Sequence, residues 1–152
     1  CKNSIAAAAA GVVDGKMVIA VGDTYGSLLV FDIHMKKIFE HSTSSDTVTT
    51  LTISDSGIVA GYATSHIKFF SLSALQYKLN LSTRLVTSLR YNFKIGMLVA
   101  SAEDAIFVID IKTFKIRTCI RSSNQLWTGA LVMGNKVFAT SYEKKKISRW
   151  KY

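Results

Sequence analysis

The sequence predicts an all-β fold made of small sheets that repeat about every forty residues. Alanines recur in similar apolar contexts, VIAVG, IVAGY, LVASA and VFATS, at Ala20, Ala60, Ala100 and Ala139, which gives intervals of 40, 40 and 39 residues. Apolar runs of about four to eight residues lie between turns rich in Gly, Asp, Ser and Asn, and no stretch keeps a helical period for about twelve. Such a period is typical of radially repeated or stacked β-architectures, in which each sheet buries its faces against its neighbours.

The composition is that of one globular unit. The chain has 152 residues, of which 49% are hydrophobic and 19% charged, so it can bury a substantial core. The longest apolar run, Ile5 to Val13, is far shorter than the roughly 20 residues of a membrane-spanning helix, and no transmembrane segment is predicted. The alanine-rich run after Lys2 resembles a signal peptide, but the repeat places a strand there, so secretion is not supported.

The cysteines indicate a reducing compartment. Cys1 and Cys119 are the two cysteines of the chain, too few for a disulfide framework and without a metal-ligand spacing. We therefore expect an intracellular protein, cytoplasmic or nuclear.

Each repeat begins with two strands joined by a short turn. The innermost strands are expected at Ile5 to Val12, Val48 to Ile53, Val86 to Tyr91 and Trp127 to Val132. Their turns are Asp14-Gly15, Asp55 to Gly57, Asn92 to Gly96 and Gly134-Asn135. The second strand carries the recurrent alanine, whose small side chain is expected to let the sheet pack closely against the neighbouring one.

The third strand of each repeat carries a bulky residue near its end, as packing between sheets requires. These strands are expected at Ser27 to Ile33, Ile67 to Leu72, Ile106 to Ile111 and Ile147 to Tyr152. A fourth strand, at Lys36 to His41, Gln76 to Leu81 and Lys115 to Arg121, alternates Lys or Arg with apolar residues. That alternation favours an outer strand with one solvated face, and its charges discourage pairing at the edge.

The third strands resemble those of WD-repeat β-propellers, in which a Trp-Asp pair closes the third strand of each blade. The segment Gly22 to Ile33, GDTYGSLLVFDI, is the best match within the chain. The positions that correspond to the pair are Phe31-Asp32, Phe70-Ser71, Ile109-Asp110 and Trp150-Lys151. The resemblance implies blades of four antiparallel strands and a scaffold that binds proteins or peptides.

Two departures from the family pattern predict how the blades are held together. The Gly-His pair that opens many family repeats is missing. The aspartate expected before the third strand is replaced by Tyr25, Thr64, Glu103 and Lys144. We therefore expect a divergent propeller held by apolar packing in place of the family's His-Ser-Asp-Trp hydrogen-bond network.

The strand count predicts an incomplete ring. The blades span approximately residues 4–42, 46–82, 84–122 and 126–152 of a single domain, 1–152, and the last lacks its outer strand. Propellers of this family usually close with about seven blades, so two terminal faces are left open. Because the sequence starts at Cys1 and not at a methionine, we expect a fragment of a longer polypeptide or a partial chain. The ending RWKY resembles the last blade of the family's propellers, which the N-terminal part of the chain often completes, and this resemblance implies the C-terminal part of a propeller. The missing half is then another segment of the polypeptide, a partner chain or a second copy.

No catalytic residue, metal site or cofactor is predicted, and the chain is not expected to be an enzyme. Gly11 to Met17 lacks the Ser or Thr and the helix of a phosphate loop, and Gly22 to Gly26 is better explained as a hairpin than as a nucleophile elbow. The three histidines, His34, His41 and His66, lack a metal-ligand spacing. Adjacent Glu103 and Asp104 point apart, which argues against a paired-carboxylate mechanism.

Basic side chains give the one candidate interaction surface. The formal net charge is +9. Five basic residues are expected on one rim: Lys144, Lys145, Lys146, Arg84 and Arg121. Five more are expected on the opposite rim: Lys16, Lys36, Lys94, Lys112 and Lys136. Such ridges suit phosphates, acidic peptides or anionic lipids, and the alternative is a solvated surface that keeps the strands from aggregating.

We therefore expect a non-enzymatic scaffold that mediates protein–protein interaction within a larger assembly. The alternative is a propeller rim that binds nucleic acid or anionic phospholipid through its basic surface. The third hypothesis is an active site completed by residues of the missing half.

Overall fold

The computed structural model describes residues 4–42, 46–81, 84–122, 125–143 and 147–151. Within these ranges the chain forms four antiparallel sheets and no helix. The first three sheets have four strands each, and the fourth has three. The predicted fold class is therefore confirmed: an all-β chain of four-stranded blades whose last blade has three described strands.

The strands follow one another along the chain within each blade, in the order of the sheet. The first blade contains β1 (Ile5–Val13), β2 (Lys16–Asp23), β3 (Leu28–Asp32) and β4 (Lys37–His41). The second contains β5 (Val48–Ser54), β6 (Gly57–Tyr62), β7 (His66–Phe70) and β8 (Leu75–Asn80). The third contains β9 (Val86–Asn92), β10 (Met97–Ala102), β11 (Ala105–Asp110) and β12 (Lys115–Arg121), and the fourth contains β13 (Trp127–Met133), β14 (Lys136–Ser141) and β15 (Ile147–Lys151).

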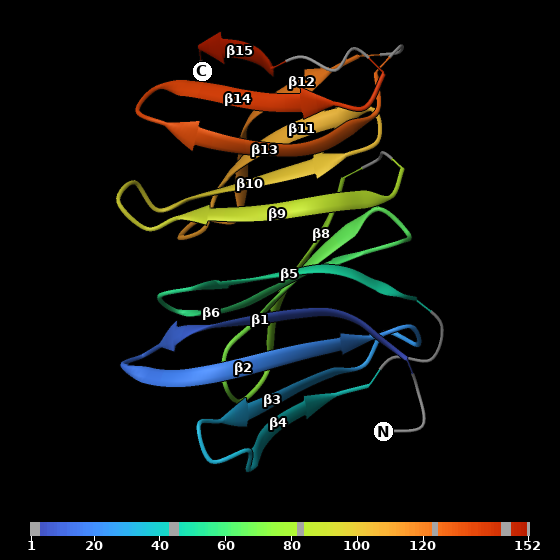
Figure 1. Ribbon diagram of the computed structural model, residues 1–152. Helices are drawn as coiled ribbons and strands as arrows, with labels where there is room; N and C mark the ends of the chain where they lie inside the picture. The colour runs from blue at the N-terminus through green and yellow to red at the C-terminus, as the bar shows by residue number, and fades with distance from the viewer. Residues whose placement is uncertain (1–3, 43–45, 82–83, 123–124, 144–146, 152) are drawn as a thin grey trace.

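The blades are arranged in a row, with the first and the fourth at opposite ends (Figure 1). Inner strands β1, β5, β9 and β13 lie beside one another along the row. Each blade thus packs a sheet face against the next blade, as propeller blades do. The row does not close into a ring, so the outward faces of the two terminal blades meet no other described blade.

The predicted equivalence of Ala20 with the later alanines is wrong by one residue. The three later alanines pack against the preceding blade, whereas Ala20 packs against the following one. In the second blade, Phe70 pairs with Ile58, and Ala60 lies two residues after Ile58. In the first blade, Phe31 pairs with Ile19, and the residue two positions after Ile19 is Val21, not Ala20. Since successive side chains of a strand point to opposite faces, a shift of one residue reverses the direction of the alanine. The intervals between equivalent residues are therefore 39, 40 and 39.

Threonine hydroxyls link neighbouring blades at the start of the inner strands. Thr49 Oγ1 donates to the carbonyl oxygen of Val86 at 2.6 Å, and Thr87 Oγ1 donates to that of Trp127 at 2.9 Å. Both threonines occupy bulges, where the inner strand has one residue more than the second strand. Thr128 occupies the same place in the fourth blade. The repeat therefore carries a side-chain link as well as an apolar pattern.

Candidate functional site

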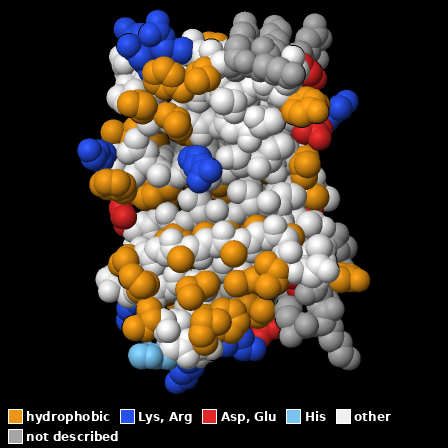
Figure 2. Space-filling model, in the orientation of Figure 1, with side chains coloured by type: hydrophobic (Ala, Val, Ile, Leu, Met, Phe, Trp, Pro, Cys, Tyr) orange, Lys and Arg blue, Asp and Glu red, His pale blue; other side chains and the backbone are white. Residues whose placement is uncertain are grey.

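The outward face of the first blade is an uncovered apolar surface. Ile19, Val21 and Phe31 lie on it. Ile19 in β2 pairs with Phe31 in β3, and Val21 lies two residues after Ile19, so all three side chains point to the same face. Their equivalents in the next two blades are buried against the preceding blade: Ile58, Ala60, Phe70, Leu98, Ala100 and Ile109. Ala8 and Ala10, which pair with Val21 and Ile19, are exposed on the same face. We call the surface formed by Ala8, Ala10, Ile19, Val21 and Phe31 the first open face. Figure 2 shows hydrophobic side chains gathered over β1 and β2.

The outward face of the fourth blade also meets no other described blade, but it is not wholly apolar. A groove of about 940 Å³ lies over it, beside the turn between β9 and β10, and its lining includes Leu131, Met133, Phe138 and Ile147. Arg149, which pairs with Phe138, takes the position at which the other blades bury Val30, Phe69 and Val108. A charge there cannot be covered without an acidic partner or access to water. The two ends of the row therefore demand different partners.

The basic residues predicted for one rim are only partly described. Lys144, Lys145 and Lys146 lie outside the described residues. Arg84 Nη1 lies 4.0 Å from Glu103 Oε2, and Arg121 Nη1 lies 3.9 Å from Asp104 Oδ2. These acids offset the positive charge of the two exposed arginines, although pairs at this exposure stabilise little. Binding at this rim stays a prediction.

The opposite rim carries more unpaired positive charge. Its exposed lysines are Lys16, Lys36, Lys94, Lys112 and Lys136, and we call it the lysine rim. It is formed by the turns that follow the first and third strands of each blade, and Asp14 N donates to Asp55 O across it at 3.0 Å. Within the described chain, none of the five lysines forms an ion pair.

The first residue of each Trp-Asp-like pair packs between blades or against an open end. Phe70 and Ile109 are fully buried, whereas Phe31 is half-buried because it lies on the first open face. Trp150 meets Trp127 edge-on, with ring centroids 5.3 Å apart. These positions therefore serve packing.

The second residue of the pair caps a turn of the lysine rim. Asp32 Oδ1, Ser71 Oγ and Asp110 Oδ1 each accept hydrogen bonds from backbone amides two to four residues later. Arg117 Nη2 also donates to Asp110 Oδ2 at 2.6 Å, and this bond lowers the pKa of the Asp110 carboxyl, with burial opposing it. Lys151 is exposed at the end of β15. The acids thus order the turns that display the lysines.

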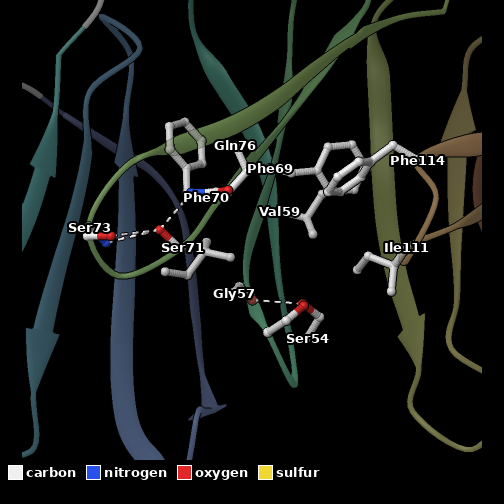
Figure 3. Close-up of a pocket in the computed structure, with 12 residues that line it drawn as sticks. Ser54, Gly57, Val59, Phe69, Phe70, Ser71, Ser73, Gln76, Ile111 and Phe114 are labelled. Atoms are coloured by element: carbon white, nitrogen blue, oxygen red, sulfur yellow. Dashed lines mark hydrogen bonds between the residues drawn. The ribbon is translucent and has the colours of Figure 1, made fainter.

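A pocket of about 410 Å³ opens on the lysine rim between the second and third blades, and we call it the rim pocket. In Figure 3, Phe69 and Phe114 lie together on one side of it, and Ser71 and Ser73 lie on the other. The Phe69 and Phe114 ring centroids are 4.8 Å apart. The rest of the lining is Ser54, Ser56, Gly57, Ile58, Val59, Phe70, Gln76 and Ile111. The pocket therefore joins an apolar wall to a hydroxyl-rich edge.

The rim pocket exists because the second blade lacks side chains that, in the other blades, fill the space between one blade and the blade that follows it. Gly57 comes directly before Ile58, the residue that pairs with Phe70. The first and third blades have Val18 and Met97 at this position. These two side chains pack into the seams, the apolar layers between neighbouring blades, that join the first blade to the second and the third to the fourth. A Cβ on Gly57 would collide with the Phe70 carbonyl oxygen. Ser54 donates to Gly57 O within its own hairpin, whereas Asn92 at that position donates across to the fourth blade. This pocket was not predicted, although one glycine among larger residues was its signal.

A hydrogen-bond network in the second blade adds to the apolar packing that the sequence predicts. Asp46 accepts from Thr64 N at 3.0 Å, from the Thr64 hydroxyl and from His66 Nε2 at 2.9 Å. His66 stacks on Tyr62 with centroids 5.0 Å apart, and Lys68 Nζ lies 4.3 Å from the centre of the Tyr62 ring. Burial lowers the pKa of both His66 and Lys68. The acid comes from the segment before the inner strand and the imidazole from the third strand, which sequence spacing alone did not reveal.

The described residues hold no group of three or more His, Cys, Asp or Glu placed to bind a metal ion. His66 belongs to the network above, and the His41 ring packs against the Phe70 ring at a tilt of 56°, with centroids 5.0 Å apart. No helix within the described ranges is long and apolar enough to cross a membrane.

Comparison with known proteins matches the chain by structure. No family model and no curated protein matches it. It is similar to the computationally designed Ika4 protein, with a TM-score of 0.82 and 19% identity over 99% of this chain and 92% of that chain. It is similar to the RRP9 WD40 repeats, with a TM-score of 0.84 and 11% identity over 100% of this chain and 49% of that chain. It is also similar to a chain of the Mitotic Checkpoint Complex, with a TM-score of 0.82 and 14% identity over 98% of this chain and 50% of that chain.

These likenesses show a WD40-like propeller fold. This chain spans about half the length of the RRP9 and checkpoint chains that it matches. Its row of blades therefore matches half of those longer chains, and it matches 92% of the Ika4 chain.

Proposed function

We propose that this chain is part of a non-enzymatic scaffold that binds other proteins or peptides within a larger intracellular assembly. The observation that carries the proposal is the first open face, where side chains equivalent to buried core residues meet no described blade. A contiguous apolar surface of this kind marks an interface. Its cover is a further blade, supplied by the same polypeptide, by a partner chain or by a second copy.

The test is affinity purification of the full-length protein, followed by measurement of the mass of the complex. We expect a protein partner at fixed stoichiometry. Chemical cross-linking of that complex should join the partner, or the ring-completing segment, to Lys16 or to other lysines beside the first open face. A full-length protein that is recovered alone, in every extract in which it is expressed, would count against the scaffold.

A second candidate function is supported by the lysine rim. Five exposed lysines without an ion pair in the described chain suit a phosphate polymer or an anionic membrane. Binding to a single-stranded oligonucleotide or to phosphatidylserine vesicles should then weaken steeply as salt is raised. Absent or salt-independent binding would eliminate this candidate.

A further inference from the structure

We propose that the rim pocket binds an apolar side chain of an acidic peptide, with the lysines around it engaging the peptide's carboxylates. The proposal rests on the scaffold function proposed above and names the class of partner. Two independent features support it: the chemistry of the pocket and the charge of the surface around it.

The wall of the rim pocket suits an apolar anchor. Val59, Phe69 and Ile111 are 1%, 3% and 6% exposed, so the wall is closely packed and presents only a small apolar surface to the pocket. A volume of about 410 Å³ falls within the range of sites that enclose small ligands or side chains. None of the described residues that line the pocket is charged. A phosphate group inside it would therefore lack a cationic partner, which favours an apolar side chain as the occupant.

The edge of the rim pocket can hold a peptide backbone. Gln76 Nε2 donates to Ser71 Oγ at 3.1 Å, and this bond fixes the amide group at the mouth of the pocket. The Gln76 carbonyl oxygen is then free to accept from a peptide N–H. Ser56 and Ser73 add exposed hydroxyls at the same edge. An extended peptide can thus place one side chain inward while its backbone bonds to the edge.

The turns beside the pocket supply positive charge. Lys112 lies in the turn that contributes Ile111 and Phe114 to the pocket, and Ile111 N donates to Gly96 O at 3.3 Å, which brings the turn of Lys94 alongside. Asp55, between Ser54 and Ser56 of the pocket lining, accepts a hydrogen bond from the Tyr91 hydroxyl at 3.1 Å. Excess positive charge of this kind speeds the encounter with acidic partners and selects against basic ones.

Phe114 is held in place before any ligand arrives. Its φ of 55° is left-handed, a conformation that a bulky residue adopts only where its surroundings impose it. Its ring stacks on Tyr77 with centroids 4.8 Å apart and an interplanar angle of 7°. A wall that is already ordered reduces the entropy cost of binding.

The test measures binding of a fluorescein-labelled peptide, Glu-Asp-Glu-Phe-Glu-Asp-Glu, to the full chain. A peptide with serine in place of the phenylalanine should bind about tenfold or more weakly, because burying a phenylalanine ring is worth at least that factor. Equal affinities for the two peptides would overturn the pocket as an anchor site. Competition of the labelled peptide by an oligonucleotide or by phosphatidylserine vesicles, at equal or higher affinity, would overturn the proposal in favour of phosphate binding.

Two sets of variants locate the site. Ser54→Asn fills the pocket with the residue of the third blade and should abolish the preference for phenylalanine. The double change Lys94→Gln with Lys112→Gln should weaken binding about tenfold, whereas Arg84→Gln with Arg121→Gln, which removes the same charge from the opposite rim, should weaken it less than about twofold. Equal losses from the two double variants would contradict the proposal.

Photo-cross-linking keeps the test independent of how the variants fold. A peptide with benzoylphenylalanine in place of phenylalanine should label the unaltered protein within residues 54–59, 69–76 or 111–114. Labelling confined to other segments would overturn the site. Failure of peptide binding while affinity purification still recovers a stable partner would reject the pocket and leave the scaffold standing.

Discussion

The seam between the first and second blades and the seam between the second and third are built from equivalent strands but bury different chemistry. At the position paired with the recurrent alanine, the second blade places Lys68 in the first seam, and the third blade places Phe107 in the second seam. Both are buried, at 6% and 2% exposure. Strand pairing thus decides where a side chain lies, whereas its local partners decide whether that place can hold a charge.

The two seams therefore differ in what stabilises them. The second seam is a continuous apolar cluster that includes Phe69, Leu98 and Phe107. The first seam adds Asp46, His66 and Lys68 to its apolar cluster. Buried polar groups stabilise little in net terms but cost much when one partner is removed. Removing an aromatic ring from the second seam should therefore lower the free energy of unfolding most. In the first seam, the loss should come from removing one hydrogen-bonding partner of the polar network.

The largest effect is expected in the second seam. Phe107→Ala should lower the free energy of unfolding by about 3–5 kcal/mol, because it removes a fully buried ring and leaves a cavity. Urea denaturation followed by circular dichroism measures this loss. Phe93→Ala, at a side chain 67% exposed, is the matched control and should change stability by less than about 0.5 kcal/mol. Similar losses from the two variants would contradict the assigned core.

A smaller loss is expected from breaking the network of the first seam. Asp46→Ala should lower the free energy of unfolding by about 2–3 kcal/mol, since Thr64 and His66 lose a charged acceptor in a buried place. Asp46→Asn keeps one acceptor and should lose less. Thermal unfolding of the two variants gives the order, and an asparagine variant as unstable as the alanine variant would argue against the hydrogen bonds.

The sequence was sufficient to predict these seams in outline. Apolar alternation and turn residues located the first, third and fourth strands of the repeats to within two residues at each described end, and Lys115–Arg121 was placed without error. The third strands end earlier than predicted at Ile33 and Leu72, because the side chains of Asp32 and Ser71 capture the following turn. Such capping competes with strand pairing, and periodicity does not detect it.

The network and the rim pocket could not be predicted, for two physical reasons. Asp46 and His66 are distant in sequence and meet only because a loop passes the start of the third strand. The pocket depends on the absence of a side chain at Gly57, whose importance is visible only once strand register aligns it with Val18 and Met97. Local patterns report what is present along a strand and say little about what is missing across a seam.

A gain in stability is expected where a charge is replaced. Lys68→Met should raise the free energy of unfolding by about 1 kcal/mol, because an apolar chain of similar length replaces a buried ammonium. The variant gives up the contact between Lys68 Nζ and the Tyr62 ring, which limits the gain. Measurement in urea at neutral pH decides the sign, and a loss would mean that the ammonium stabilises the seam.

The smallest effect is a pH dependence confined to the first seam. Burial and then Lys78 lower the pKa of His66, with Asp46 opposing, and burial and Lys68 lower that of His41. Below the ordinary value of 6.5 the unfolded chain binds protons that the folded chain does not, so stability falls as the pH drops from 6.5 toward the lowered pKa values. Urea titrations above and below pH 6.5 measure the loss, which Lys68→Met should reduce. An unchanged loss in that variant would rule out this coupling.

The one-residue offset of the first blade has a consequence for how these repeats can be exchanged, by duplication in a gene or by construction in the laboratory. A crossover that joins the chain after Ala20 to the chain after Ala60 follows sequence identity, yet it places the strand out of phase and turns every later side chain to the opposite face. A crossover that matches Val21 with Ala60 keeps the phase. The module that can be moved intact is therefore defined by the direction of its side chains, and in the first blade it is one residue shorter than the spacing of alanines indicates.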